Sequence, residues 1–181
     1  MLDPASAGTP SNIRPYETAL LPAYCRDTQQ WPGGNPGGLA GGKEVFGEAF
    51  VHFHHYCYAK VWLLRAESHS NSMWERRRDL ASALDDLDYV IERVPPKYFL
   101  LPEMLTMRGK ILFRQRKFAD AAVDLNKAIE QKRDYWPAYY ELARCREAMG
   151  NRKAALEVIQ DGLKYSPDSK VLHAYQRDLT K

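Results

Sequence analysis

The residues best suited to chemistry lie in the short stretch HFHHYC, which begins at His52. On a helix, His52 and His55 share one face. His54 and Cys57 share another, and either pair would supply two ligands of the kind that zinc binds, with Cys25 as a candidate third. No carboxylate or second Cys/His cluster stands at a recognisable metal spacing. We therefore expect a structural role, in which the stretch anchors the preceding segment to a helix, and we predict no cofactor.

The chain has three cysteines, Cys25, Cys57 and Cys145, so at most one disulfide can form within it. Cys25 and Cys57 precede the regular part of the sequence, and a bridge between them would hold the irregular N-terminal segment against the first helix. The alternative is that all three thiols are reduced and buried, because free cysteines usually behave as small apolar residues.

A glycine-rich stretch resembles a phosphate-binding loop at first sight, because Gly37 is followed after four residues by Gly42 and Lys43. Such a loop follows a buried strand and has Ser or Thr after the lysine to contact magnesium. Glu44 occupies that position here, and the upstream residues are rich in Pro and Gly. The glycines are better explained as permissive positions in a loop of unusual backbone geometry.

No other arrangement in the sequence indicates catalysis. The acidic residues Asp85, Asp86 and Asp88 are expected on the solvated side of a helix. No nucleophile elbow, zinc-protease helix or Ser/His/Asp arrangement is recognisable. The sequence therefore predicts a protein that is not an enzyme.

Charge and hydropathy exclude further classes of function. The formal net charge is +3, and charges of both signs alternate along the second half, which is too mild a balance to indicate nucleic-acid binding. No run approaches the ~18 to 20 apolar residues of a membrane-spanning helix.

Residues 1–10 contain no signal peptide. The small-residue opening slightly favours a mature exported bacterial protein, in the periplasm or at the cell surface, over a cytoplasmic one.

Residues 1–44 differ in composition from the rest of the chain. They contain six of the eleven prolines and seven of the eleven glycines. Such a segment cannot sustain a long helix or a central strand. We expect an irregular arm with one short helix near 16–25, and its aromatic residues indicate that it packs on the remainder of the chain.

From Val45 to the C-terminus the apolar residues recur at helical spacing. Polar residues at 68–72 and the pair Pro95-Pro96 interrupt this pattern. The predicted helices are 45–66, 73–93, 101–114, 118–131, 137–149, 152–165 and 169–179.

Two stretches of the sequence repeat with a period of 34 residues. Gly109 and Ala121 stand twelve residues apart in one unit, and Ala143 and Ala155 stand twelve apart in the next. Small residues at these places allow the two helices of a hairpin to approach closely. Pro167 closes the second of these units.

These residues resemble the tetratricopeptide repeat family over about 102–169. The resemblance implies an all-α fold, a stack of antiparallel helix hairpins that forms an α-solenoid. An earlier unit is divergent because its helices are joined by a longer connection, and the last helix resembles a capping helix. The predicted domains are an arm, 1–44, and a helical domain, 45–181, with units 45–97, 102–135 and 136–169 and a capping helix at 170–180.

The resemblance also implies a concave groove lined by the first helix of each hairpin. The family's groove positions carry four cations here against two glutamates, Glu103 and Glu147, with aromatic residues between them, and this net basic surface suits a partner with carboxylates. The asparagines of the family's carboxylate clamp are missing at the corresponding places. The predicted groove residues are Lys60, Lys110, Phe113, Arg114, Tyr140 and Arg144.

The favoured interpretation is thus a non-catalytic adaptor that binds a partner peptide or helix, acidic or with a free C-terminal carboxylate. The alternative is a structural subunit whose N-terminal arm packs on a neighbouring copy, so that the protein self-associates. Metal binding through the His/Cys stretch is the least favoured of the three.

Overall fold

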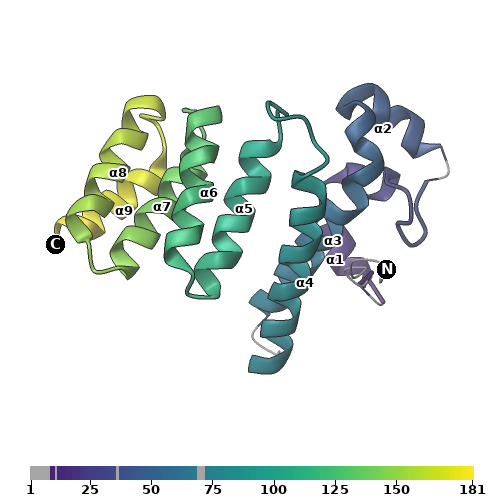
Figure 1. Ribbon diagram of the computed structural model, residues 1–181, viewed down its shortest axis with the longest axis horizontal. Coiled ribbons are helices and arrows are strands. Elements are labelled where there is room, and N and C mark those ends of the chain that lie inside the picture. The colour runs from purple at the N-terminus through teal and green to yellow at the C-terminus, as the bar shows by residue number, and fades with distance from the viewer. Residues whose placement is uncertain (1–8, 11, 36, 69–71) are drawn as a thin grey trace. The chain divides into compact units, whose positions relative to one another are not determined.

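The computed structural model describes residues 9–10, 12–35, 37–68 and 72–181 (Figure 1). Every regular element in these ranges is helical, as the sequence predicted. The chain divides after Pro95 into two compact units, termed unit 1 and unit 2. Proline cannot continue a helix, which explains a division at Pro95-Pro96. None of the described helices is both long and apolar enough to cross a membrane.

Unit 1 is built on an antiparallel hairpin of α3 (Phe53–Glu67) and α4 (Met73–Ile91). The start of α4 is fixed by a capping box. The Ser72 hydroxyl accepts a hydrogen bond from the Glu75 amide (3.2 Å), and the Glu75 carboxylate accepts one from the Ser72 amide (2.7 Å). The two helices share a buried apolar stripe that neither could bury alone.

The helix predicted for 45–66 is instead three elements. These are the end of α2 (Gly38–Phe46), the 3-10 helix η2 (Glu48–His52) and α3. Gly47 separates the first two with φ = 73°, a left-handed conformation that glycine adopts without strain. The apolar periodicity runs through this break, which is why the sequence alone suggested one helix.

The N-terminal segment contains more helix than predicted. It forms α1 (Pro15–Ala19), η1 (Ala23–Asp27) and α2. The segment packs on η2 and α3 through specific bonds. The Tyr58 hydroxyl donates to the Gln30 carbonyl (2.6 Å), and the side-chain amide of Gln29 donates to the Val51 carbonyl in η2 (2.7 Å). Trp31 also stacks on Tyr58, with ring centroids 5.8 Å apart. The prediction that the arm packs on the remainder of the chain is confirmed, although Tyr16 is exposed.

Close packing explains the glycines that resembled a phosphate loop. Gly42 lies in α2, and a Cβ there would meet the ring of Phe50 at 1.8 Å. A Cβ on Gly38 would meet the backbone of Asp27 at 2.6 Å. Both glycines allow α2 to approach its neighbours, so their role is packing and not ligand binding.

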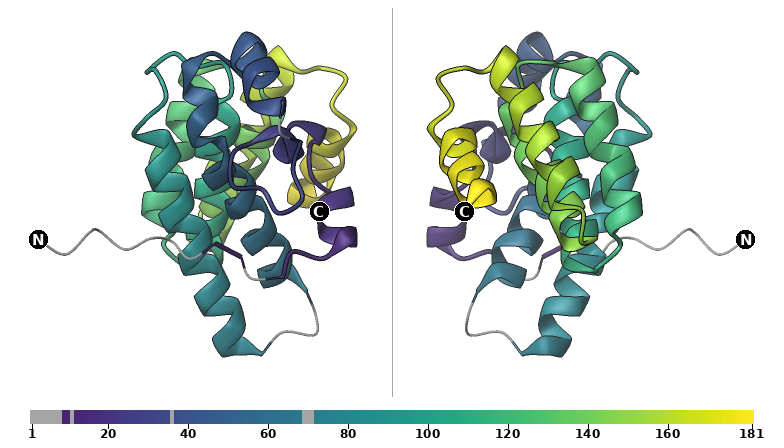
Figure 2. Two further views of the ribbon diagram at one scale, coloured as in Figure 1. Left: turned by 90° about the vertical axis from the view of Figure 1, so that its right-hand side faces the viewer. Right: turned by 90° about the vertical axis from the view of Figure 1, so that its left-hand side faces the viewer.

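Unit 2 contains five helices in the described chain, and their bounds agree with prediction to within one residue. Consecutive helices pack in antiparallel pairs. Because α7 also contacts α5 and α9, these three helices form one layer, with α6 and α8 behind them (Figure 2). The helices are α5 (Leu101–Arg114), α6 (Phe118–Gln131), α7 (Trp136–Ala148), α8 (Arg152–Tyr165) and α9 (Lys170–Thr180).

The small residues of the repeat lie where helices meet, as predicted. A Cβ on Gly109 in α5 would lie 2.8 Å from Leu125 Cγ in α6. Ala121, Ala143 and Ala155 are fully buried. A larger side chain at any of these places would force the paired helices apart.

Candidate functional site

The side chain of Arg144, on the α5–α7–α9 layer, contacts residues of both α5 and α7. Its guanidinium carbon lies 4.4 Å from the ring centroid of Phe113 on α5 and 5.8 Å from that of Tyr140 on α7. Its Nη1 donates to Glu141 Oε2 at 2.8 Å. Arg144 is half-buried and is therefore a cation of fixed position between two aromatic rings.

Helix α9 extends this layer beyond α7. The rings of Tyr140 and Tyr175 lie 5.2 Å apart. The Tyr175 hydroxyl donates to Glu147 Oε2 at 2.5 Å. Burial and this bond to a carboxylate both raise the pKa of Tyr175, so the phenol remains a donor at neutral pH. A chain of contacts thus runs from Phe113 through Arg144 and Tyr140 to Tyr175.

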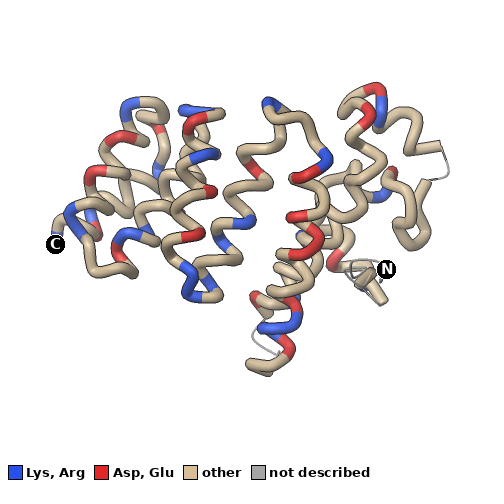
Figure 3. The backbone as a smooth tube through the Cα atoms, viewed as in Figure 1, with Lys and Arg blue, Asp and Glu red and all other residues tan. Residues whose placement is uncertain are grey.

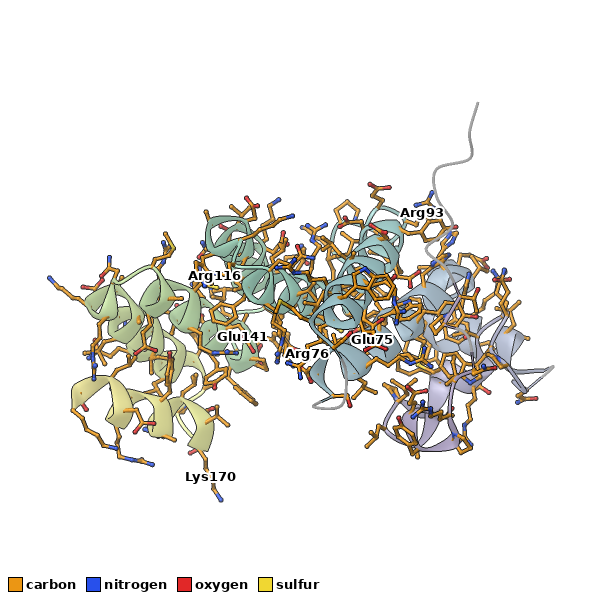
Figure 4. All side chains as sticks on the ribbon, turned by 90° about the horizontal axis from the view of Figure 1, so that it is seen from below. Glu75, Arg76, Arg93, Arg116, Glu141 and Lys170 are labelled. Atoms are coloured by element: carbon orange, nitrogen blue, oxygen red, sulfur yellow. A yellow bond between two sulfur atoms is a disulfide. The ribbon has the colours of Figure 1, made fainter. Side chains whose placement is uncertain are left out.

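Two further predicted groove residues lie on α5. Lys110 and Arg114 are four residues apart and therefore share a helix face, with Arg114 exposed and Lys110 half-buried. With Arg144 they provide three cations on the α5 and α7 part of the layer, and Glu141, labelled in Figure 4, is the partner of Arg144. The sixth predicted residue, Lys60, belongs to unit 1, where its Nζ lies 4.3 Å from the ring centroid of Tyr56.

The histidines of the HFHHYC stretch have separate partners. His54 Nδ1 lies 3.1 Å from the Val51 carbonyl oxygen. His55 Nδ1 lies 2.6 Å from Asp86 Oδ1, and His52 Nδ1 lies 3.4 Å from the Tyr89 hydroxyl.

Cys57 is not available as a thiolate ligand, because it is bonded to Cys25. The two Sγ atoms lie 2.06 Å apart and the two Cα atoms 5.7 Å apart, so of the two states that the sequence left open the bridged one is present. Among the described residues, no three His, Cys, Asp or Glu side chains are grouped to hold a metal ion. The third cysteine, Cys145, is buried, and burial raises its pKa to about 11.

The expectation that Asp86 is solvated is wrong. Its side chain is fully buried against α3, where it accepts the hydrogen bond from His55. Burial raises the pKa of Asp86 to about 6, and the bond to His55 opposes that rise. A sequence signal for this burial did exist, since Asp86 is three residues after Ala83 and four before Val90, both of which are buried.

Comparison with known proteins places this geometry in context. Residues 112–179 match the family model described as Tetratricopeptide repeat. No curated protein matches the chain. One similar solved structure is the first TPR domain of the human RPAP3 protein, with a TM-score of 0.55 and 19% identity, covering 71% of this chain and 91% of that one. Another is the first TPR of Spaghetti (RPAP3) bound to the HSP90 peptide SRMEEVD, with a TM-score of 0.51 and 22% identity, covering 68% and 93%.

Proposed function

Since residues 112–179 match the Tetratricopeptide repeat family model, we propose that this chain is a non-catalytic interaction module that binds a partner peptide on the α5–α7–α9 layer of unit 2. The observation on which this proposal depends is the position of Arg144 between Phe113 and Tyr140, with Glu141 orienting it. A guanidinium held in this way loses little side-chain entropy when it binds a further group.

The proposed ligand is an acidic peptide or one with a free C-terminal carboxylate. Arginine forms charge-assisted hydrogen bonds to carboxylates, and Lys110 and Arg114 add positive charge along α5. Phe113, Tyr140 and Tyr175 supply the aromatic contact area on which peptide affinity commonly depends. The fold likeness to a domain that holds the HSP90 peptide SRMEEVD supports a peptide as the class of ligand.

The test is a titration with three versions of one acidic peptide: with a free C-terminus, with an amidated C-terminus, and with lysines in place of its acidic residues. Fluorescence anisotropy should show binding of the first and weaker binding of the other two. The variant Lys110→Glu/Arg114→Glu should bind the first peptide at least about ten-fold more weakly, because two attractive contacts become repulsive.

The matched control is Lys127→Glu/Lys153→Glu, which makes the same charge change on exposed residues of α6 and α8. This variant should bind as the wild type does. Equal loss of affinity in both variants would mean that only net charge matters, and the proposed site would be abandoned. Unchanged binding by the Lys110→Glu/Arg114→Glu variant would have the same consequence.

The Cys25–Cys57 bridge supports an oxidising compartment as the protein's location, because such bonds are rare where thiols are kept reduced. The arm lies against η2 and α3 of its own chain, through bonds to Val51 and Tyr58 and through the bridge itself.

A further inference from the structure

Unit 1 has a pocket of about 390 Å³ at the closed end of the α3–α4 hairpin, where α1 lies beside it. The pocket belongs to unit 1 alone and shares no residue with the α5–α7–α9 layer. Tyr16 lines it from α1 and Leu20 from the residue that follows α1, and Glu75 and Arg78 line it from α4.

The deep part of the pocket consists of charged groups that are already paired. Glu17 receives two hydrogen bonds from Arg65, at 2.7 and 3.0 Å, and Asp79 receives two from Arg78, at 3.0 and 2.7 Å. Both carboxylates are buried. An apolar ligand placed here would leave these groups without water, so the pocket suits a polar group.

Large apolar side chains are exposed to solvent at this end of unit 1, two of them in the lining of the pocket and two in the first turn of α4. Tyr16 is 56% exposed and Leu20 is 67% exposed. Trp74 is 68% exposed and lies beside Arg78, whose guanidinium carbon is 5.2 Å from the indole ring, and its neighbour Met73 is 71% exposed. Apolar exposure of this extent around one pocket indicates a contact surface.

Arginines accompany these apolar residues. Arg14 lines the pocket, and the exposed run Arg76, Arg77 and Arg78 follows Trp74 in α4. Figure 3 shows this run as the basic band in the first half of α4. Figure 4 looks along α4 from this end, with Glu75 and Arg76 labelled. The pocket lining itself is balanced in charge, with three arginines and three carboxylates, so the excess positive charge at this end comes from Arg76 and Arg77.

We propose that this end of unit 1 binds the surface of a bilayer that contains anionic phospholipid. Trp74, Met73 and Leu20 enter the interfacial region, the arginines contact lipid phosphates, and the polar pocket receives a headgroup. Trp and Arg are the side chains that a membrane interface favours, the first for its amphipathic ring and the second for its charge.

The arrangement of the apolar residues favours a lipid surface over an acidic protein. A stable protein interface needs ~1,200 Å² or more of closely packed, complementary surface. Here the apolar side chains are separated from one another by a polar recess. A fluid interface can accept such separated side chains without shape complementarity, and each enters it independently.

The experiment is co-sedimentation of the full chain with vesicles of phosphatidylcholine alone and with vesicles in which phosphatidylglycerol replaces part of it. We expect binding to the anionic vesicles only, with weaker binding as salt is added. Arg76→Gln/Arg77→Gln should lower the partition coefficient roughly thirty-fold, because each arginine near the surface contributes about 1 kcal/mol. Trp74→Ser should also lower it.

The matched control is Lys127→Gln/Lys153→Gln, which removes the same charge from unit 2 and should bind as the wild type does. All substituted residues are exposed, and circular dichroism would check that the variants remain folded. Three results would overturn the proposal: no binding to anionic vesicles, equal binding to phosphatidylcholine, or unchanged binding by Trp74→Ser. Displacement by soluble polyglutamate as effective as by excess vesicles would indicate an acidic protein instead and would also overturn it.

Discussion

His55 Nδ1 lies 2.6 Å from Asp86 Oδ1, and this contact joins the first turn of α3 to the second half of α4. The Asp86 carboxylate is fully buried, with the side chains of His55 and Trp62 beside it, and both oppose the rise in its pKa. The neighbouring His54 is buried as well, and burial lowers its pKa to about 4. The hairpin thus holds an acid whose pKa is raised beside a base whose pKa is lowered.

Acidification should act on these two groups in opposite directions. Asp86 binds its proton more tightly when folded, with a pKa of about 6 in place of 3.8, so its contribution to the free energy of unfolding rises as pH falls through 6. His54 binds its proton less tightly when folded, so its contribution is present above pH 6.5 and is lost as pH falls towards 4. Each effect amounts to roughly 3 kcal/mol.

Two variants should separate these contributions. In Asp86→Asn only the effect of His54 remains, with a smaller one of the same sign from His52, so stability should fall steeply between pH 6.5 and pH 4. In His54→Gln stability should instead rise as pH falls through 6. Urea midpoints measured across this range, with the wild type as the reference, would check both. Parallel pH profiles for the two variants would contradict the assignment.

The Cys25–Cys57 bridge should contribute strongly to the stability of unit 1. It joins residues 32 apart, and its loss frees a loop of that length in the unfolded chain. The chain-entropy estimate for such a loop is about 3 to 4 kcal/mol. A reductant should therefore lower the urea midpoint of the wild type. The reductant should leave the urea midpoint of the Cys25→Ala/Cys57→Ala variant unchanged. A wild-type midpoint that does not respond to the reductant would contradict the prediction.

Adjacent glycines in α2 should respond oppositely to the same change. An alanine Cβ at Gly42 would overlap the buried ring of Phe50, so Gly42→Ala should destabilise unit 1 by about 1 to 3 kcal/mol. A Cβ at Gly41 meets nothing within 4 Å, so Gly41→Ala should stabilise the helix by about 0.5 to 1 kcal/mol. Thermal unfolding of the two variants is the measurement. The same sign of change in both would show that α2 is not packed as described.

Tyr175 should hold α9 against α7. Tyr175→Phe keeps the ring against Tyr140 and loses only the hydrogen bond to Glu147, which should cost about 0.5 to 1 kcal/mol. Tyr175→Ala loses the ring contact as well and should cost more. Amide hydrogen exchange in α9 should be faster in the second variant than in the first. Wild-type exchange rates in Tyr175→Ala would exclude this role.

Local pattern was sufficient to predict most of unit 2. The bounds of α5, α6 and α8 agree with prediction, because apolar residues at helical spacing and a short polar connection specify each helix from its own residues. The close crossing at Gly109 was also predictable, since two helices joined by a tight turn must meet at their small residues. The repeat, and with it the fold class, could therefore be inferred from the sequence by itself.

Tertiary structure alone decided the features that depend on residues far apart in the chain. Position 42 of α2 needs a glycine because the ring of Phe50 occupies the space where a Cβ would lie. The composition of the sequence does not reveal this contact. Asp86 is buried because His55, 31 residues earlier, provides its partner. Arg144 is positioned by Phe113 on another helix as well as by Glu141 on its own. The free energy of each of these contacts exists only after the helices have packed, whereas the helices themselves are specified by neighbours within a few residues.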